Sequence, residues 1–172
     1  MRTLDPATRV ERYQQCVDCD EKLREAIGHL RLVEHLDGTA YVPCLLMAHA
    51  FLEQNRAQEA LGALLEAVKR KPDFAASEAE QSRPFADYFG DARSGDSAFL
   101  DAQMLRYAHI GDLNPNQAEA LALQVYCTWR LGELSRTREA ARELEGLATK
   151  RPAEAYLLDY ATLMRGVSAA PR

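Results

Sequence analysis

Apolar residues recur at helical spacing along most of the chain, in stretches divided by short polar breaks. The first stretch is expected to begin at Asp5-Pro6, because an aspartate N-cap followed by proline at the first helical position marks a helix start. Apolar positions continue on both sides of a polar break at residues 18–20, and Gly38 ends the unit. The pattern therefore predicts two helices joined by a turn over residues 7–40.

The second stretch, residues 41–74, has the same organisation, with its polar break at residues 53–55. Basic residues gather just before Pro72, where the helix dipole favours cations and proline cannot continue the helix. A period of 34 residues relates the two stretches, which predicts antiparallel helix pairs that bury their apolar faces by stacking on the next pair. The aligned positions are Val10 with Cys44, Val17 with Phe51, Ala26 with Ala60, Leu30 with Leu64, and Val33 with Ala67.

Within residues 41–74, small residues stand at Ala48, Ala60 and Ala67, an aromatic at Phe51 and a proline at Pro72. This pattern resembles a tetratricopeptide repeat. Cys44 replaces the tryptophan or leucine usual in that family, and Asn55 replaces the usual glycine of the turn, where asparagine tolerates the same left-handed backbone.

The resemblance covers most of the chain and implies an all-α fold, an α-α superhelix of antiparallel helix pairs in a single domain over residues 1–172. Gly132 stands earlier in the last repeat than the family pattern places it. The expected units are repeats at about 7–40 and 41–74, an insertion at 75–96, a degenerate repeat at 97–120, a repeat at 121–154 and a capping helix at 153–166.

The insertion departs from the repeat pattern in composition. Residues 75–96 contain five carboxylates against two arginines, and an aromatic cluster of Phe85, Tyr88 and Phe89. Because a structureless loop of this length is unusual in a compact domain, we expect either a short helix or a functional insertion here. Both a binding loop and a spacer fit the sequence.

Composition narrows the functional classes. Hydrophobic residues make up 47% of the chain and charged residues 27%, which is typical of a globular protein. A net charge of −5 without a dense basic stripe argues against a nucleic-acid partner. No apolar run approaches the ~20 residues that span a bilayer, and the first residues lack the pattern of an export signal. We therefore expect a cytoplasmic protein with reduced cysteines and no membrane segment.

Signals for chemistry are weak. Cys16 and Cys19 have the spacing of half a zinc site, but no second pair stands at a metal-like distance, so two small apolar helix residues are the favoured interpretation. The glycine-containing segment 90–96 lacks the lysine and Ser/Thr of a phosphate loop. We predict no catalytic residue, metal or cofactor and no enzymatic activity. An enzyme or a metal-binding protein stays as a minor alternative.

The resemblance implies that the first helix of each repeat lines a concave groove. The groove would be apolar in its middle with acidic edges, and would suit a helical or extended segment with apolar anchors and basic flanks. Trp129 is either an anchor in this groove or a core residue. The predicted groove residues are Val42, Leu45, His49, Leu52, Glu53, Val125, Trp129 and Glu133.

Two functions follow from this pattern. The first is an adaptor or chaperone-like module that binds a segment of another protein in the groove. The alternative is a structural assembly subunit that self-associates through its repeat faces, with a homodimer as the simplest product. If Leu45 and Trp129 line the groove, alanine at both positions weakens partner capture without loss of helix. If both changes unfold the protein, they belong to the core.

Overall fold

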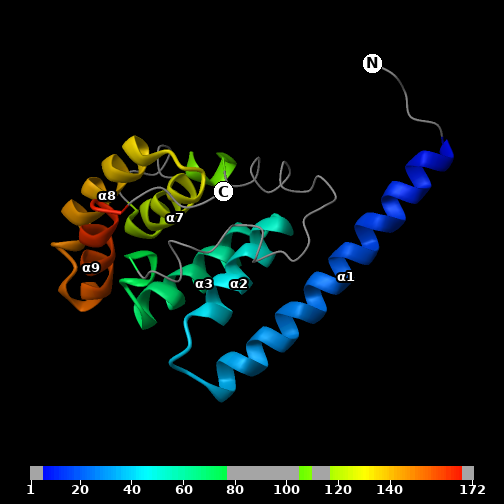
Figure 1. Cartoon of the computed structure of the whole chain (residues 1–172), viewed down its shortest axis with the longest axis horizontal. Helices are drawn as coiled ribbons and strands as arrows, with labels where there is room; N and C mark the ends of the chain where they lie inside the picture. Colours follow the sequence, from blue (N-terminus) through cyan, green and yellow to red (C-terminus); the bar gives the residue numbers. More distant parts are fainter. Residues whose placement is uncertain (1–5, 77–104, 110–116, 168–172) are drawn as a thin grey trace.

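The computed structural model describes residues 6–76, 105–109 and 117–167, with side chains from residue 20 onward. Every regular element in these ranges is helical, and adjacent helices pack in an antiparallel-like manner (Figure 1). The predicted all-α class is confirmed. The elements are α1 (Pro6–Leu36), α2 (Val42–Glu53), α3 (Ala57–Arg70), η1 (Phe74–Ala76), a helical turn at 105–108, α7 (Ala118–Arg130), α8 (Leu134–Ala148), η3 (Pro152–Glu154) and α9 (Ala155–Met164).

None of the described helices has a stretch that is both long and apolar enough to cross a membrane. A capping helix was expected at 153–166, and α9 lies within that range. Most of the insertion at 75–96 and most of the degenerate repeat at 97–120 lie outside the described residues.

The first unit differs from its prediction. The sequence predicted a turn at residues 18–20, but α1 is one continuous helix there. No glycine or proline occurs between Pro6 and Gly28, and Asp and Cys lower helix propensity by less than about 1 kcal/mol each. Asp20 also forms an i,i+4 ion pair with Arg24 at 2.6 Å, which supports the helix. The prediction of a break at residues 18–20 was therefore wrong.

The hairpins α2–α3 and α7–α8 share one turn geometry. Asn55 has φ 58° and Gly132 has φ 78°, so each turn contains one left-handed residue. The next residue donates its backbone N–H to a carbonyl five residues back, at 2.8 Å in both turns: Arg56 to Phe51 and Glu133 to Thr128. The two hairpins are therefore equivalent, and their positions correspond at an offset of 77 residues.

This correspondence corrects the alignment of the last repeat. The window equivalent to 41–74 is 118–151, three residues earlier than the predicted 121–154. The alignment on Pro152 misled, because α8 is one residue longer than α3 and Pro152 follows its helix by four residues where Pro72 follows by two. Gly132, which seemed to come early in the turn, is the residue that marks the true register.

Small residues and aromatic rings form the core. Ala60 and Ala67 on α3 are fully buried, as expected where helices cross closely. Phe74 in η1 stacks on Tyr160 of α9 with ring centroids 6.0 Å apart, and its ring lies 6.3 Å from that of Trp129 on α7. The aromatic rings thus join the first hairpin to α7 and α9.

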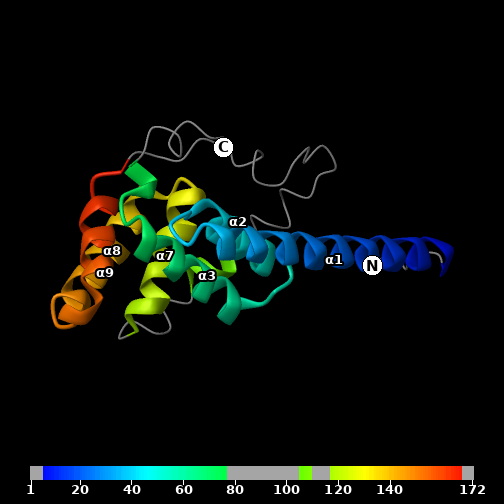
Figure 2. The same ribbon diagram turned by 90° about the horizontal axis from the view of Figure 1, so that it is seen from below.

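Polar contacts at two positions along the second half of α1 attach it to the α2–α3 hairpin. Gln54, just after α2, donates to Asp20 at 2.8 Å. Arg70, at the end of α3, donates to Glu34 at 2.7 Å and to the Ala40 carbonyl at 2.9 Å. The first half of α1 extends away from the other described helices (Figure 2).

Gly62 lies in the middle of α3, and a Cβ built on it meets nothing within 4 Å. Gly62→Ala is expected to raise the free energy of unfolding by about 0.5–1 kcal/mol, because alanine has the higher helix propensity. Urea unfolding followed by circular dichroism measures the change. The control Gly132→Ala should lower stability, because φ 78° disfavours a side chain. A loss of stability in Gly62→Ala contradicts the described environment.

Candidate functional site

The structure buries most of the predicted groove residues. Val42, Glu53 and Glu133 are partly exposed, whereas the other five are fully buried. Trp129, for which core and groove were both open, belongs to the hydrophobic core. The five buried residues are Leu45, His49, Leu52, Val125 and Trp129.

The corrected register also changes which residues of α7 correspond to the face of α2. Val125 corresponds to Ala48, the small position at the helix crossing, and Glu133 lies in the turn between α7 and α8. Neither belongs to the equivalent face. We name the shared surface the first-helix face: Val42, Leu45, His49, Leu52 and Glu53 on α2, with Glu119, Ala122, Tyr126, Trp129 and Arg130 on α7.

A polar contact joins the two helices on this face. Nε2 of His49 and the hydroxyl of Tyr126 share a hydrogen bond, and the two rings have centroids 5.5 Å apart. Both side chains are buried. His49 and Tyr126 occupy equivalent positions in the two hairpins. A single side-chain contact therefore links equivalent positions of α2 and α7, which lie 77 residues apart in sequence, while the backbone of α7 packs against α3.

Burial and a neighbouring cation set the charge state of this contact. Burial lowers the pKa of His49 well below its usual 6.5, and the positive charge of Arg130 lowers it further. His49 is therefore neutral at pH 7, and a neutral imidazole has one ring nitrogen that can donate a hydrogen bond and one that can accept it.

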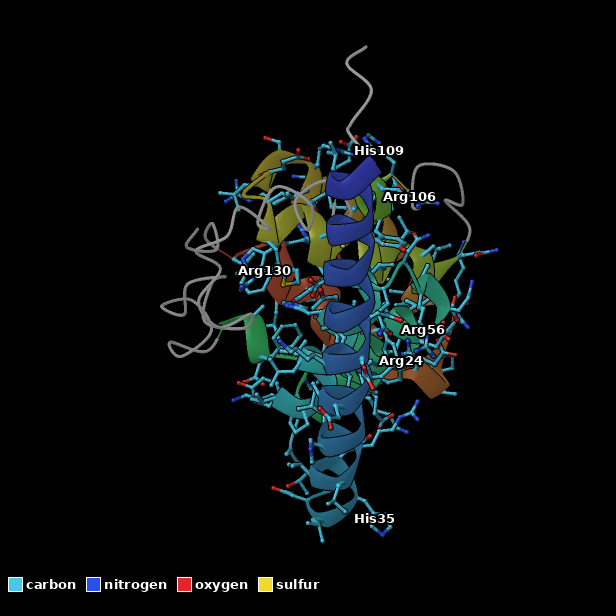
Figure 3. The ribbon with its side chains drawn as sticks, turned by 90° about the vertical axis from the view of Figure 1, so that its right-hand side faces the viewer. Arg24, His35, Arg56, Arg106, His109 and Arg130 are labelled. Atoms are coloured by element: carbon cyan, nitrogen blue, oxygen red, sulfur yellow. The ribbon has the colours of Figure 1, made fainter. Side chains whose placement is uncertain are left out.

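Arg130 is itself a buried cation on the first-helix face. Its side chain is only 4% exposed, and its guanidinium carbon lies 5.3 Å from the centre of the Trp129 ring. In Figure 3, Arg130 lies on the opposite side of α1 from Arg24 and Arg56. Gln124 and Thr128 are further buried polar residues of α7.

Sequence reasoning missed Tyr126 and Arg130. The signal that could have found them is the left-handed turn, because aligning Gly132 with Asn55 places Tyr126 opposite His49 and Arg130 opposite Glu53. No family model, curated protein or solved structure matches the chain.

Both hairpins contact the helical turn at 105–108 or the residue that follows it. Arg106 donates to Oδ1 of Asn55 at 2.8 Å, and the Tyr107 hydroxyl donates to the same oxygen at 3.1 Å. Arg136 on α8 lies 3.3 Å from Nδ1 of His109. These contacts position the helical turn beside both hairpins and give it a structural role.

Among the described residues, neither a metal site nor a reactive thiol is found. There, no group of three or more His, Cys, Asp or Glu side chains is placed to hold a metal ion. Cys44 and Cys127 are free and buried, and burial raises the pKa of Cys44 to about 11 and that of Cys127 further. Both are therefore protonated at neutral pH and weak nucleophiles. The side chains of Cys16 and Cys19 lie outside the described residues.

Proposed function

We propose that this chain is a tetratricopeptide-like module that holds a segment of another protein against the first-helix face. The observation that supports this most directly is the His49–Tyr126 contact. It joins equivalent positions of two equivalent hairpins, which is the arrangement expected when repeats stack with their first helices on one side.

The chemistry of the face indicates the class of ligand. Its centre, including His49 and Tyr126, is buried between the helices, so a partner meets the partly exposed edge, where Glu53 adds a carboxylate at the end of α2. Val42 and Glu53 are the partly exposed members on α2. The proposed partner is therefore a segment that contacts the two ends of α2 with an apolar residue and a basic residue.

A charge change at these two positions tests the proposal. Val42→Glu combined with Glu53→Lys should reduce the capture of the partner by at least about tenfold, because it removes an apolar contact and reverses the charge that meets a basic flank. Glutamate is tolerated at the first residue of a helix, so the fold should be retained. The measurement is affinity capture from native lysate with quantitative mass spectrometry, followed by calorimetry on each enriched protein.

The matched control is Leu134→Glu combined with Glu143→Lys, which makes the same changes at the first residue of α8 and on its exposed surface. Far-ultraviolet circular dichroism verifies that both variants keep their helix content. Equal capture by the wild type and both variants would contradict a binding role for the first-helix face.

A further inference from the structure

A short segment before α7, residues 105–109, contacts side chains of both hairpins, and we call it the strap. Arg106 and Tyr107 both donate to Oδ1 of Asn55 in the α2–α3 turn, at 2.8 Å and 3.1 Å. Nδ1 of His109 lies 3.3 Å from the guanidinium of Arg136, in the first turn of α8. The strap is therefore attached to both hairpins although it belongs to neither.

Asn55 has two separate roles in this arrangement. Its backbone, at φ 58°, makes the left-handed turn, and its side-chain oxygen accepts both hydrogen bonds from the strap. The turn itself does not require that side chain, because Gly132 makes the equivalent turn between α7 and α8 at φ 78°. The side chain of Asn55 is therefore not needed for the hairpin, and its contacts are those that hold the strap.

The strap has an inner and an outer side. Tyr107 is 2% exposed and Ala108 is fully buried, and both belong to the hydrophobic core, whereas Leu105, Arg106 and His109 are exposed. A single helical turn is not stable alone, because helix nucleation fixes several residues for one hydrogen bond. The helical form of the strap therefore depends on its contacts with the hairpins.

The hairpins, in contrast, are joined to each other by contacts that do not involve the strap. The ring of Phe74, which follows α3, lies 6.3 Å from that of Trp129 on α7, and His49 on α2 shares a hydrogen bond with Tyr126. These contacts stay in place when the strap is undocked. A segment with few contacts of its own opens at a lower free energy than the whole domain.

We infer that the strap is a conformational device that the Asn55 side chain latches closed, and that it opens as a unit while both hairpins stay folded. Opening separates Tyr107 and Ala108 from the core and uncovers the surface beneath them. Arg106 and Tyr107 share one acceptor, so loss of that acceptor releases both donors at once. No residue of the strap belongs to the first-helix face, so the inference is independent of the proposed function.

Amide hydrogen exchange measured by NMR on the full chain tests the latch. In the wild type, the amide of His109 should be protected, because its N–H donates to the Arg106 carbonyl. Asn55→Gly keeps the left-handed turn and removes the acceptor, so the strap amides should exchange at least about tenfold faster, while those of α3 and α8 keep their rates. Asn55→Asp is the matched control: its carboxylate still accepts from both donors, so the strap should exchange no faster than in the wild type.

If Asn55→Gly loses helix content by circular dichroism, Arg106→Ala combined with Tyr107→Phe decides, because it removes both donors and leaves the hairpin turn unchanged. An acceleration confined to the strap supports the latch. Three results overturn it: unprotected strap amides in the wild type, unchanged strap rates in the deciding variant, or an equal acceleration in α3 and α8.

Discussion

Replacing Trp129 with alanine is expected to lower the free energy of unfolding by about 3–5 kcal/mol. The side chain is fully buried, and its ring lies 6.0 Å from that of Tyr126 and 6.3 Å from that of Phe74. Removing it leaves a cavity between α7 and η1 and takes away the ring that lies beside the Arg130 guanidinium. Since domains of this size are stable by about 5–15 kcal/mol, the variant should be close to unfolding at 37 °C.

Chemical unfolding followed by circular dichroism measures this loss. Leu163→Ala is the control, because Leu163 is 37% exposed and should lose much less stability. A change of less than about 1 kcal/mol in Trp129→Ala would contradict its place in the core. Loss of partner capture with unchanged stability would restore Trp129 as a groove anchor. These outcomes separate the two roles that the sequence left open.

Acidification from pH 7 to pH 5 is expected to destabilise the protein through His49. The folded-state pKa of His49 lies well below 6.5, whereas the unfolded chain takes up a proton near 6.5. The contribution of His49 to stability is therefore fully present above about pH 6.5 and decreases as the pH falls below it. The expected slope is about 1.4 kcal/mol per pH unit, until the folded-state pKa is reached.

Urea unfolding at several pH values between 5 and 7 measures this slope. His49→Gln provides the control, because glutamine keeps a hydrogen-bonding group near Tyr126 but has no proton to gain. Glu59 and Glu119 do not interfere, since hydrogen bonds from Arg56 and Arg151 lower their pKa values from 4.5. An unchanged slope in His49→Gln would show that another group causes the acid sensitivity.

The hairpin over residues 41–74 was predictable because its signals are local. Asn55 adopts the left-handed backbone expected at the turn, and α3 ends at Arg70 just before Pro72. Ala48, Ala60 and Ala67 are all buried, as the resemblance implied for small positions. Turn chemistry and helix stops depend on a few neighbouring residues, so one sequence is enough to read them.

In the predicted last repeat, two local sequence signals imply different alignments with residues 41–74. Pro152 and Gly132 each suggested a register, three residues apart, and the turn hydrogen bonds of the structure follow Gly132. A proline after a helix marks only where the helix has ended, and α8 has one more residue than α3. A left-handed turn residue is the more reliable mark, because its backbone conformation is specific to one position of the turn.

The sequence by itself determined the helical class, the turns at Asn55 and Gly132, and a helix within residues 153–166. Only the tertiary structure showed how α7 is surrounded. Every residue of that helix except Glu119 is buried, so its sequence has no polar side from which hydrophobic periodicity could indicate the packing. The tertiary structure also decided that α1 is one helix. The cost of continuing a helix through residues 18–20 is small and no glycine or proline interrupts α1 before Gly28, so a polar break in the pattern does not by itself specify a turn.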